Sequence, residues 1–283
     1  MDRLLASGAR PHFGFLMLAL GFMVFEYGLG RLSRRNTHDW RESAATLGVA
    51  IGQNLTRGIE ALLVAGPTGF LYAHRLFRFD PTSVQALIGL LLASEFGYYW
   101  YHRGAHRIRW MWASHVVHHS TTHMNLTSAA RLGWTGGLSG GALFFLPLVW
   151  LGFNPVALGA MLGINLAYQF FIHTEFVPSL GPLEWVFNTP RHHCVHHAAN
   201  ADCLDRNYGG ILIVFDRLFG TVALAPRDEP LRYGVVGGTP SFNPARIALG
   251  EWGALLHDAW QAGSWHRRFR VLFGAPGAIE TVP

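Results

Sequence analysis

The chain has 283 residues, of which 50% are hydrophobic and only 14% are charged, compared with roughly 25% charged residues in an average soluble domain. This composition disfavours an ordinary soluble domain and indicates a protein embedded in a membrane. The net charge is +5 and every basic residue is an arginine, but the arginines are spread among apolar segments, so we expect no nucleic-acid binding.

About 20 apolar residues cross a bilayer as a helix, and the first such segment is residues 12–30. No small-residue cleavage site follows it, so we expect an uncleaved first span and not a signal peptide. The remaining spans are predicted near residues 44–73, 84–101, 136–152 and 155–172, the last two as a hairpin. The predicted fold class is all-α: a polytopic membrane helical bundle of about four to five spans, forming one domain over residues 1–283.

Arginine clusters follow the first and third predicted spans, and the positive-inside rule places both loops in the cytoplasm. With the N-terminus outside, residues 102–135 and 173–283 form a histidine-rich helical cap on the cytoplasmic face. We therefore expect a multi-pass protein of a bacterial inner membrane with a cytoplasmic active site. The second predicted span is interrupted by the polar residues Gln53, Asn54, Arg57 and Glu60. It is either one tilted helix with a polar stripe or a span plus a re-entrant piece.

Eleven of the 16 histidines lie between residues 102 and 197, most of them at helical i, i+3 or i+4 spacing. YHRGAHR, HVVHH and HCVHH each carry two or three, and FIHTE carries one at the end of the predicted hairpin. Residues at these spacings share one face of a helix, so each box presents its imidazoles in one direction. The predicted metal ligands are His102, His106, His115, His118, His119, His173, His193, His196 and His197, with His123 and His192 as further candidates that lie off the register of their boxes.

The alternative for a single histidine is an ordinary hydrogen-bonded core or surface residue. This alternative does not fit the boxes, because converging imidazoles without a metal would repel one another when protonated or would each need a buried hydrogen-bond partner. Cys194 is expected to be a spacer within its box, and the two cysteines of the chain favour a reducing compartment. We assign the ordinary role to His12, His38, His74, His257 and His266.

Eight or nine imidazoles fill the coordination shells of two metal ions, whereas three or four saturate one zinc ion. The sequence contains no HExxH motif, which disfavours a zincin protease, and no ExxH motif, which excludes a carboxylate-type diiron bundle. Imidazole suits iron, zinc, copper and nickel alike, so the ligand type leaves the metal open. The sequence therefore predicts a redox site rich in nitrogen ligands.

Glu95 lies on the same helical stripe as His102 and His106, which follow it by seven and eleven residues. An acid inside a membrane span costs about 2.5–3.5 kcal/mol and is a functional candidate for that reason. We expect it to contact a ligand histidine, the substrate or a cofactor. A locally paired or snorkelling acid is the alternative.

The boxes in this order, with the stretches EFGYYWYHRGAH, WASHVVHHSTTHMNLTSAAR and NYGGILIVFDRLFGT, resemble the fatty acid hydroxylase and sterol desaturase superfamily of membrane-bound diiron oxygenases. LGPLEWVFNTP and YGVVGGTPSFNP look most like its alkylglycerol monooxygenase branch. The resemblance implies nine histidine ligands for two iron ions, O2 as co-substrate and an external electron donor. Asn188, Asn207, Tyr208 and Asp216 match motif positions near the site, and Asn188, Asp216 and Glu95 are our candidate catalytic residues.

This chain departs from some branches of the superfamily at Val177, where they carry a further histidine. We expect fewer membrane segments here than in the animal alkylglycerol enzyme, so a pterin dependence is not assumed.

The expected function is O2-dependent hydroxylation or desaturation of a lipid (fatty acyl, sterol or ether lipid) drawn from the bilayer. Electrons would come from an electron-donor protein or another reductant. A zinc-dependent membrane lipid hydrolase is the strongest alternative, because the same imidazoles would hold zinc and activate water. A histidine-rich metal transporter fits less well, because its histidines would lie in the middle of the spans. A bis-histidine haem protein would leave the triplets unexplained.

Overall fold

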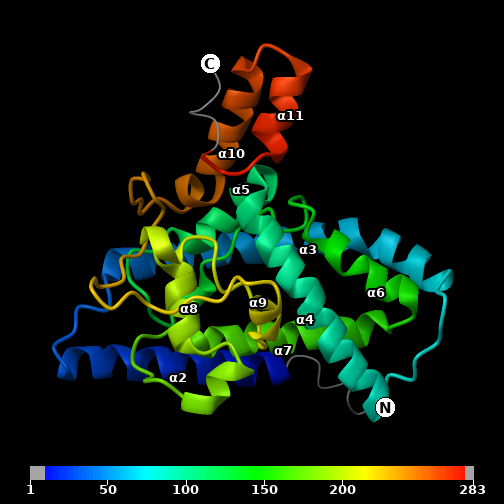
Figure 1. The fold of residues 1–283 in the computed structure, drawn as a ribbon, viewed down its shortest axis with the longest axis horizontal. Helices are drawn as coiled ribbons and strands as arrows, with labels where there is room; N and C mark the ends of the chain where they lie inside the picture. The colour runs from blue at the N-terminus through cyan, green and yellow to red at the C-terminus, as the bar shows by residue number, and fades with distance from the viewer. Residues whose placement is uncertain (1–9, 278–283) are drawn as a thin grey trace.

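The computed structural model describes residues 10–277, and all regular elements in that range are helices (Figure 1). The all-α prediction is confirmed. Residues 1–9 and 278–283 of the predicted domain lie outside the described residues, as does the side chain of His12. The α-helices are α2 (Arg10–Leu32), α3 (Trp40–Ala73), α4 (Val84–Arg107), α5 (Arg109–His119), α6 (Leu146–Leu151), α7 (Pro155–Ile172), α8 (Pro190–His197), α9 (Val214–Leu218), α10 (Pro244–Gln261) and α11 (Trp265–Phe273).

Four long helices, α2, α3, α4 and α7, form the body of the molecule, and three of them begin at a capping side chain (Figure 1). Asp39 caps α3, Ser83 caps α4 and Asn154 caps α7, each by accepting a backbone N–H of the first turn. Helix α3 runs through Pro67 without ending. The second predicted span is therefore one continuous helix, and the re-entrant alternative is wrong.

The segment predicted as a span at 136–152 is much shorter than expected. It consists of a 3-10 turn, η2 (Gly141–Phe144), followed by the six-residue helix α6. Gly140 and Gly152 bound this segment with φ angles of 88° and 125°, and a Cβ at Gly152 would lie 2.2 Å from the backbone oxygen of Phe77. Residues 141–151 reach about 16 Å as a helix, roughly half the hydrocarbon thickness.

Two helical segments, Gly14–Leu32 and Pro155–Ile172, are long and apolar enough to cross a membrane, judged by length and composition. Helix α3 also exposes a row of large apolar side chains at intervals of three to four residues. Exposed apolar surface on this scale requires a non-aqueous partner. The other predicted spans stay a prediction. The row on α3 consists of Leu47, Ile51, Leu55, Ile59 and Leu62.

Helix α5 carries three of the candidate histidines and is held by the C-terminal helices. Ile108 is extended (φ −120°, ψ 115°), which turns the chain between α4 and α5. The buried Arg109 then pairs with Glu251 (3.0 Å) and Asp258 (2.7 Å) of α10. Figure 1 shows α10 and α11 projecting from the body beside α5.

Candidate metal centre

Four helices bring nine histidines together, and their ring nitrogens form two groups whose ligand atoms lie within 4.8 Å of one another. Helices α4, α5 and α8 each contribute two or three, and His173 directly follows α7. All of them are buried except His115, which is partly buried. The five-histidine cluster consists of His102, His106, His115, His119 and His196, and the four-histidine cluster of His118, His173, His193 and His197.

Both triplets are divided between the clusters. On α5, His115 and His119 belong to the five-histidine cluster and His118 to the other. On α8 the division is reversed, with His196 alone in the five-histidine cluster. The clusters adjoin, because the rings of His119 and His197, one from each, stack with centroids 4.4 Å apart.

Backbone carbonyl groups fix the proton position of several rings. A carbonyl oxygen only accepts hydrogen bonds, so a neutral imidazole whose Nδ1 faces one carries its proton on Nδ1 and leaves a lone pair on Nε2. The Nδ1 atoms in this position are those of His102 (Tyr208 carbonyl, 2.8 Å), His118 (Arg131 carbonyl, 3.3 Å), His173 (Gln169 carbonyl, 2.6 Å) and His196 (Arg206 carbonyl, 2.8 Å).

This arrangement has its clearest consequence at His118 and His173, whose Nε2 atoms lie 3.1 Å apart. Both rings hold their proton on Nδ1, so two lone pairs face each other, which is repulsive unless a cation binds both. Burial lowers the pKa of His118 well below the usual 6.5, so protonation does not relieve the repulsion near neutral pH. The pair fits a metal ion.

The remaining contacts have the same spacing. Neighbouring Nε2 atoms within each cluster lie 3.0–3.2 Å apart. A metal bound to imidazole nitrogens at about 2.0–2.1 Å separates neighbouring ligand atoms by about 2.9–3.4 Å. The buried Nε2 atoms of His106 and His196 have no hydrogen-bond partner among the described residues. Both clusters are therefore compatible with a metal site.

The loop of residues 205–208 contacts the Nδ1 atoms of three histidines of the five-histidine cluster. The contacts are Asp205 Oδ1 with His106 (3.6 Å), the Arg206 carbonyl with His196 (2.8 Å) and the Tyr208 carbonyl with His102 (2.8 Å). Asp205 and Asn207 have φ angles of 59° and 56°, which are unfavourable for residues with a Cβ. The Asn207 side chain offsets this cost by donating to the carbonyls of His192 and Ala223, both at 2.9 Å.

The three predicted catalytic residues bind the backbone that follows this loop. Asp216 accepts the N–H groups of residues 208 and 209 at 2.8 and 2.7 Å, and Glu95 those of residues 211 and 212 at 2.8 and 2.9 Å. Asn188 donates to the carbonyl of residue 209 at 2.6 Å. Among the described residues, none of the three makes a hydrogen bond to a cluster imidazole. The expected contact of Glu95 with a ligand histidine is therefore absent among the described residues, whereas its expected contact with substrate or cofactor stays a prediction.

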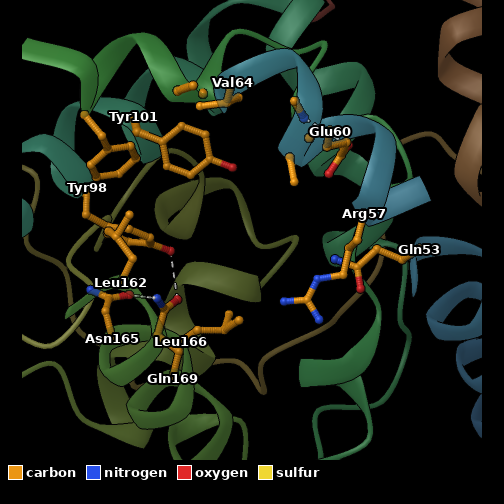
Figure 2. Close-up of a pocket in the computed structure, with 16 residues that line it drawn as sticks. Gln53, Arg57, Glu60, Val64, Tyr98, Tyr101, Leu162, Asn165, Leu166 and Gln169 are labelled. Carbon is orange, nitrogen blue, oxygen red and sulfur yellow. Dashed lines mark hydrogen bonds between the residues drawn. The ribbon is translucent and has the colours of Figure 1, made fainter. Parts of the chain in front are cut away.

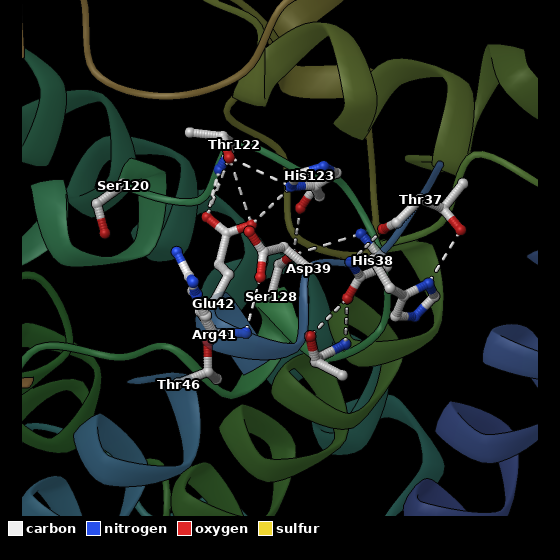
Figure 3. A network of polar contacts seen from close by, with 12 residues as sticks. Thr37, His38, Asp39, Arg41, Glu42, Thr46, Ser120, Thr122, His123 and Ser128 are labelled. Atoms are coloured by element: carbon white, nitrogen blue, oxygen red, sulfur yellow. Dashed lines mark hydrogen bonds and ion pairs between the residues drawn. The ribbon is translucent and has the colours of Figure 1, made fainter. Parts of the chain in front are cut away.

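His123 and His192 lie outside both clusters. His123 donates from Nδ1 to Glu42 at 2.9 Å, as Figure 3 shows, and this bond raises its pKa. His192 is fully buried, with Nδ1 3.4 Å from Thr189 Oγ1. Cys194 also stays outside, with Sγ 3.5 Å from the Thr174 carbonyl. The five histidines given ordinary roles are absent from both clusters, so far as the structure describes them.

Sequence reasoning missed Arg131, the largest of the fully buried side chains. Its guanidinium donates to Thr46 Oγ1 (3.0 Å), Ser120 Oγ (3.1 Å) and the Glu42 carbonyl (3.0 Å). Its own carbonyl is the acceptor for His118, so this network positions a histidine of the four-histidine cluster. An arginine shortly after the HVVHH box was the available indication.

A comparison with protein families matches residues 87–221 to the family described as fatty acid hydroxylase. This range contains all nine cluster histidines. The superfamily resemblance of the histidine boxes is confirmed, and the histidine-rich part of the chain belongs to the fatty acid hydroxylase family. No solved structure matches the chain with comparable significance.

Curated proteins with similar sequences also point to the fatty acid hydroxylase family. The chain is 39% identical over 186 residues to alkylglycerol monooxygenase of Xenopus tropicalis, covering 66% of this chain and 41% of the relative. It is 37% identical over 220 residues to the human alkylglycerol monooxygenase, covering 74% and 47%. It is 31% identical over 192 residues to ornithine lipid hydroxylase OlsE of Rhizobium tropici, covering 68% and 57%. The chain spans about half the length of the curated relatives it matches.

Proposed function

We propose that the protein is a membrane-bound non-haem diiron oxygenase that hydroxylates or desaturates a lipid. The observation that carries the proposal is the pair of adjoining histidine clusters, in which lone pairs converge at the spacing of metal ligands. The names of the relatives, monooxygenase and lipid hydroxylase, favour oxygen chemistry over hydrolysis. Asn188, Asp216 and Glu95 act in this proposal as positioning residues for the five-histidine cluster.

Two iron ions held by these clusters would supply the redox chemistry that activates O2. In hydroxylation, one oxygen atom enters a C–H bond and the other leaves as water, which consumes two electrons and two protons from an external donor. In desaturation, two hydrogen atoms leave the lipid and both oxygen atoms leave as water, with the same consumption of electrons and protons. The protein holds the imidazoles in one tautomer and excludes water through burial of the clusters.

We further propose that the chain is an integral, multi-pass membrane protein with its histidine cap in the cytoplasm. The apolar faces of α2, α3 and α7 support a bilayer location. The lipid would enter sideways from the bilayer, and an electron-donor protein or small reductant would approach from the cap. The inner membrane of a bacterium is the proposed compartment.

The test is turnover with isotopically labelled oxygen. Protein purified in detergent from iron-replete cells is expected to hold two iron ions per chain and, with a chemical reductant, to add one labelled oxygen atom to a lipid or to remove two hydrogens from it. His118→Ala is expected to lose both metal and turnover, whereas the exposed His257→Ala is expected to keep both. Stoichiometric zinc with turnover in the absence of O2 would establish the alternative, a zinc-dependent lipid hydrolase.

A further inference from the structure

A cavity of about 490 Å³ lies between α3, α4, α7 and the segment of residues 136–145 (Figure 2). Its lining is mostly apolar, with Val64, Leu162 and Leu166 among the wall residues. A volume of this size accommodates a small ligand or one end of a lipid. The cavity is open to the surface of the molecule.

The cavity adjoins both histidine clusters through two of its wall residues. The Tyr98 ring packs against His102, with ring centroids 5.4 Å apart. The Gln169 carbonyl accepts from His173 Nδ1, and its side-chain oxygen accepts the Tyr98 hydroxyl at 2.8 Å. A molecule in the cavity is therefore one layer of side chains away from each cluster.

Most polar groups of the wall already have protein partners. Asn165 donates to Glu95 and accepts from Gln169. Glu60 accepts the N–H of Gly137 at 2.9 Å. These contacts provide partners for Asn165 and Gln169 on α7 and for Glu60 on α3. The remaining charged side chain of the wall is a cation on α3.

Arg57 is that cation, and the residues that the structure describes give its side chain no ion pair and no hydrogen bond. Figure 2 shows its guanidinium reaching from α3 into the cavity, toward the wall that carries Leu166 and Gln169. Arg57 lies near the middle of the predicted span at 44–73, where a charged side chain is costly and marks a functional site by default. The planar guanidinium binds carboxylate and phosphate oxygens through paired N–H groups.

We propose that the cavity holds the polar end of the lipid substrate and that Arg57 binds an anionic carboxylate or phosphate at that end. This inference rests on the proposed function, because it takes the neighbouring clusters to be the oxidising site. It adds that the substrate is an anionic amphiphile. Since the cavity is next to both clusters, the carbon that reacts lies near the polar end of the lipid and not at the far end of its chain.

The test measures binding without turnover, using 1-O-hexadecylglycerol and its 3-phosphate, two lipids that differ only in one anionic group. In nanodiscs of a neutral lipid and without O2, the phosphate form is expected to bind about tenfold or more tightly than the neutral form, as expected for a hydrogen-bonded charge pair. Arg57→Gln is expected to abolish this preference and leave the affinity for the neutral lipid unchanged. Arg57→Lys is expected to keep part of it.

Arg41→Gln is the matched control, because Arg41 is exposed at the start of the same helix. Unchanged iron content and gel-filtration behaviour of Arg57→Gln would show that the variant folds. Inorganic phosphate at millimolar concentration is expected not to displace the lipid phosphate; displacement would show a free-anion site instead. Equal binding of both lipids by the unaltered protein, or a preference that survives in Arg57→Gln, would overturn the proposal, whereas the diiron function is judged separately from iron content and turnover.

Discussion

At the scale of single residues, the position of one proton decides what an imidazole does in this site. A lone histidine with a free tautomer donates as readily as it accepts. His118 and His173 have lost that freedom, because the carbonyls of Arg131 and Gln169 hold both protons on Nδ1. Because two backbone carbonyls accept these protons, the lone pairs of both Nε2 atoms point into the cluster. A free lone pair on a ring nitrogen is the property required of a metal ligand.

The unequal size of the clusters predicts unequal effects of ligand removal. His173→Ala leaves three imidazoles in the four-histidine cluster, and the bound metal is expected to fall from two ions to about one per chain. His115→Ala leaves four in the other cluster, and most of the metal is expected to remain, although activity falls in both variants. Elemental analysis after gel filtration measures the ratio. Equal metal content in both variants and in His257→Ala would contradict the ligand assignment.

His123 provides a pH-dependent contribution to stability. Its hydrogen bond to Glu42 raises its pKa above 6.5, so the folded protein holds this proton more tightly than the unfolded chain. The stabilisation is complete below about pH 6.5 and is lost as the pH rises through the higher folded-state pKa. His123→Gln is expected to lower the free energy of unfolding by about 1 kcal/mol at about pH 6 and by less at about pH 9. Denaturant unfolding of the protein in detergent measures both values, and an effect that does not change with pH would contradict the assignment.

The histidines were predictable as a set but not as two clusters. Spacing on a helix shows which imidazoles share a face and selected eight of the nine, whereas His173 was predicted from its place at the end of the hairpin and from the family resemblance. It does not show that His118 joins a different cluster from His115 and His119, because that depends on how α5, α7 and α8 cross. The carbonyl partners of His102, His118 and His196 were also beyond prediction, since they lie 10 to 106 residues away in the sequence.

At the scale of elements, the backbone of residues 208–212 is a support for the five-histidine cluster. Asp216 on α9, Glu95 on α4 and Asn188 just before α8 satisfy five of its polar groups, including the N–H groups of residues 208, 209, 211 and 212. The sequence identified Asn188 and Asp216 from motif positions and Glu95 from its helical stripe, but it did not indicate which backbone groups they bind. Their role follows from the position of this segment, whose Tyr208 carbonyl accepts a hydrogen bond from His102.

Asp216→Asn is expected to loosen this support. The amide has one acceptor oxygen in place of two, so it cannot accept the N–H groups of Tyr208 and Gly209 in the same way. Weaker holding of the Tyr208 carbonyl affects His102, and metal affinity of the five-histidine cluster is expected to fall about 10–100-fold. Chelator competition on the purified protein measures this loss. The exposed Asp202→Asn is the control, and affinity equal to that of the control would show that Asp216 has no positioning role.

The long helices were predictable, whereas the segment before α7 was not. Apolar length located the ends of α2, α3, α4 and α7 to within six residues. Residues 136–152 are just as apolar, yet Gly140 and Gly152 adopt positive φ angles and confine the α-helical part to α6. A hydropathy pattern does not reveal this, because it depends on the close approach of Gly152 to the backbone of Phe77.

At the scale of the whole molecule, the site is positioned by a body whose outer faces are apolar and a cap whose interior is polar. Leu55 and Leu62 on α3 are 77% and 78% exposed, and Val156 on α7 is 81% exposed. Faces of this kind are stable in a bilayer and prone to aggregation in water. The same embedding would leave the cavity near Arg57 open to lipid, which links the membrane location to the substrate.

A single charge on α2 tests this location, because a bilayer and water predict opposite results. Val24 is 70% exposed near the centre of the Gly14–Leu32 segment. If α2 spans the membrane, Val24→Arg costs about 2.5–3.5 kcal/mol of insertion free energy, and the carbonate-resistant fraction of the protein is expected to fall. Leu32→Arg, at the end of the helix beside Arg31, is expected to have little effect, since its charge reaches the headgroups. A Val24→Arg protein that becomes more soluble and keeps its activity would show that α2 faces water and that the lipid must reach the clusters by another path.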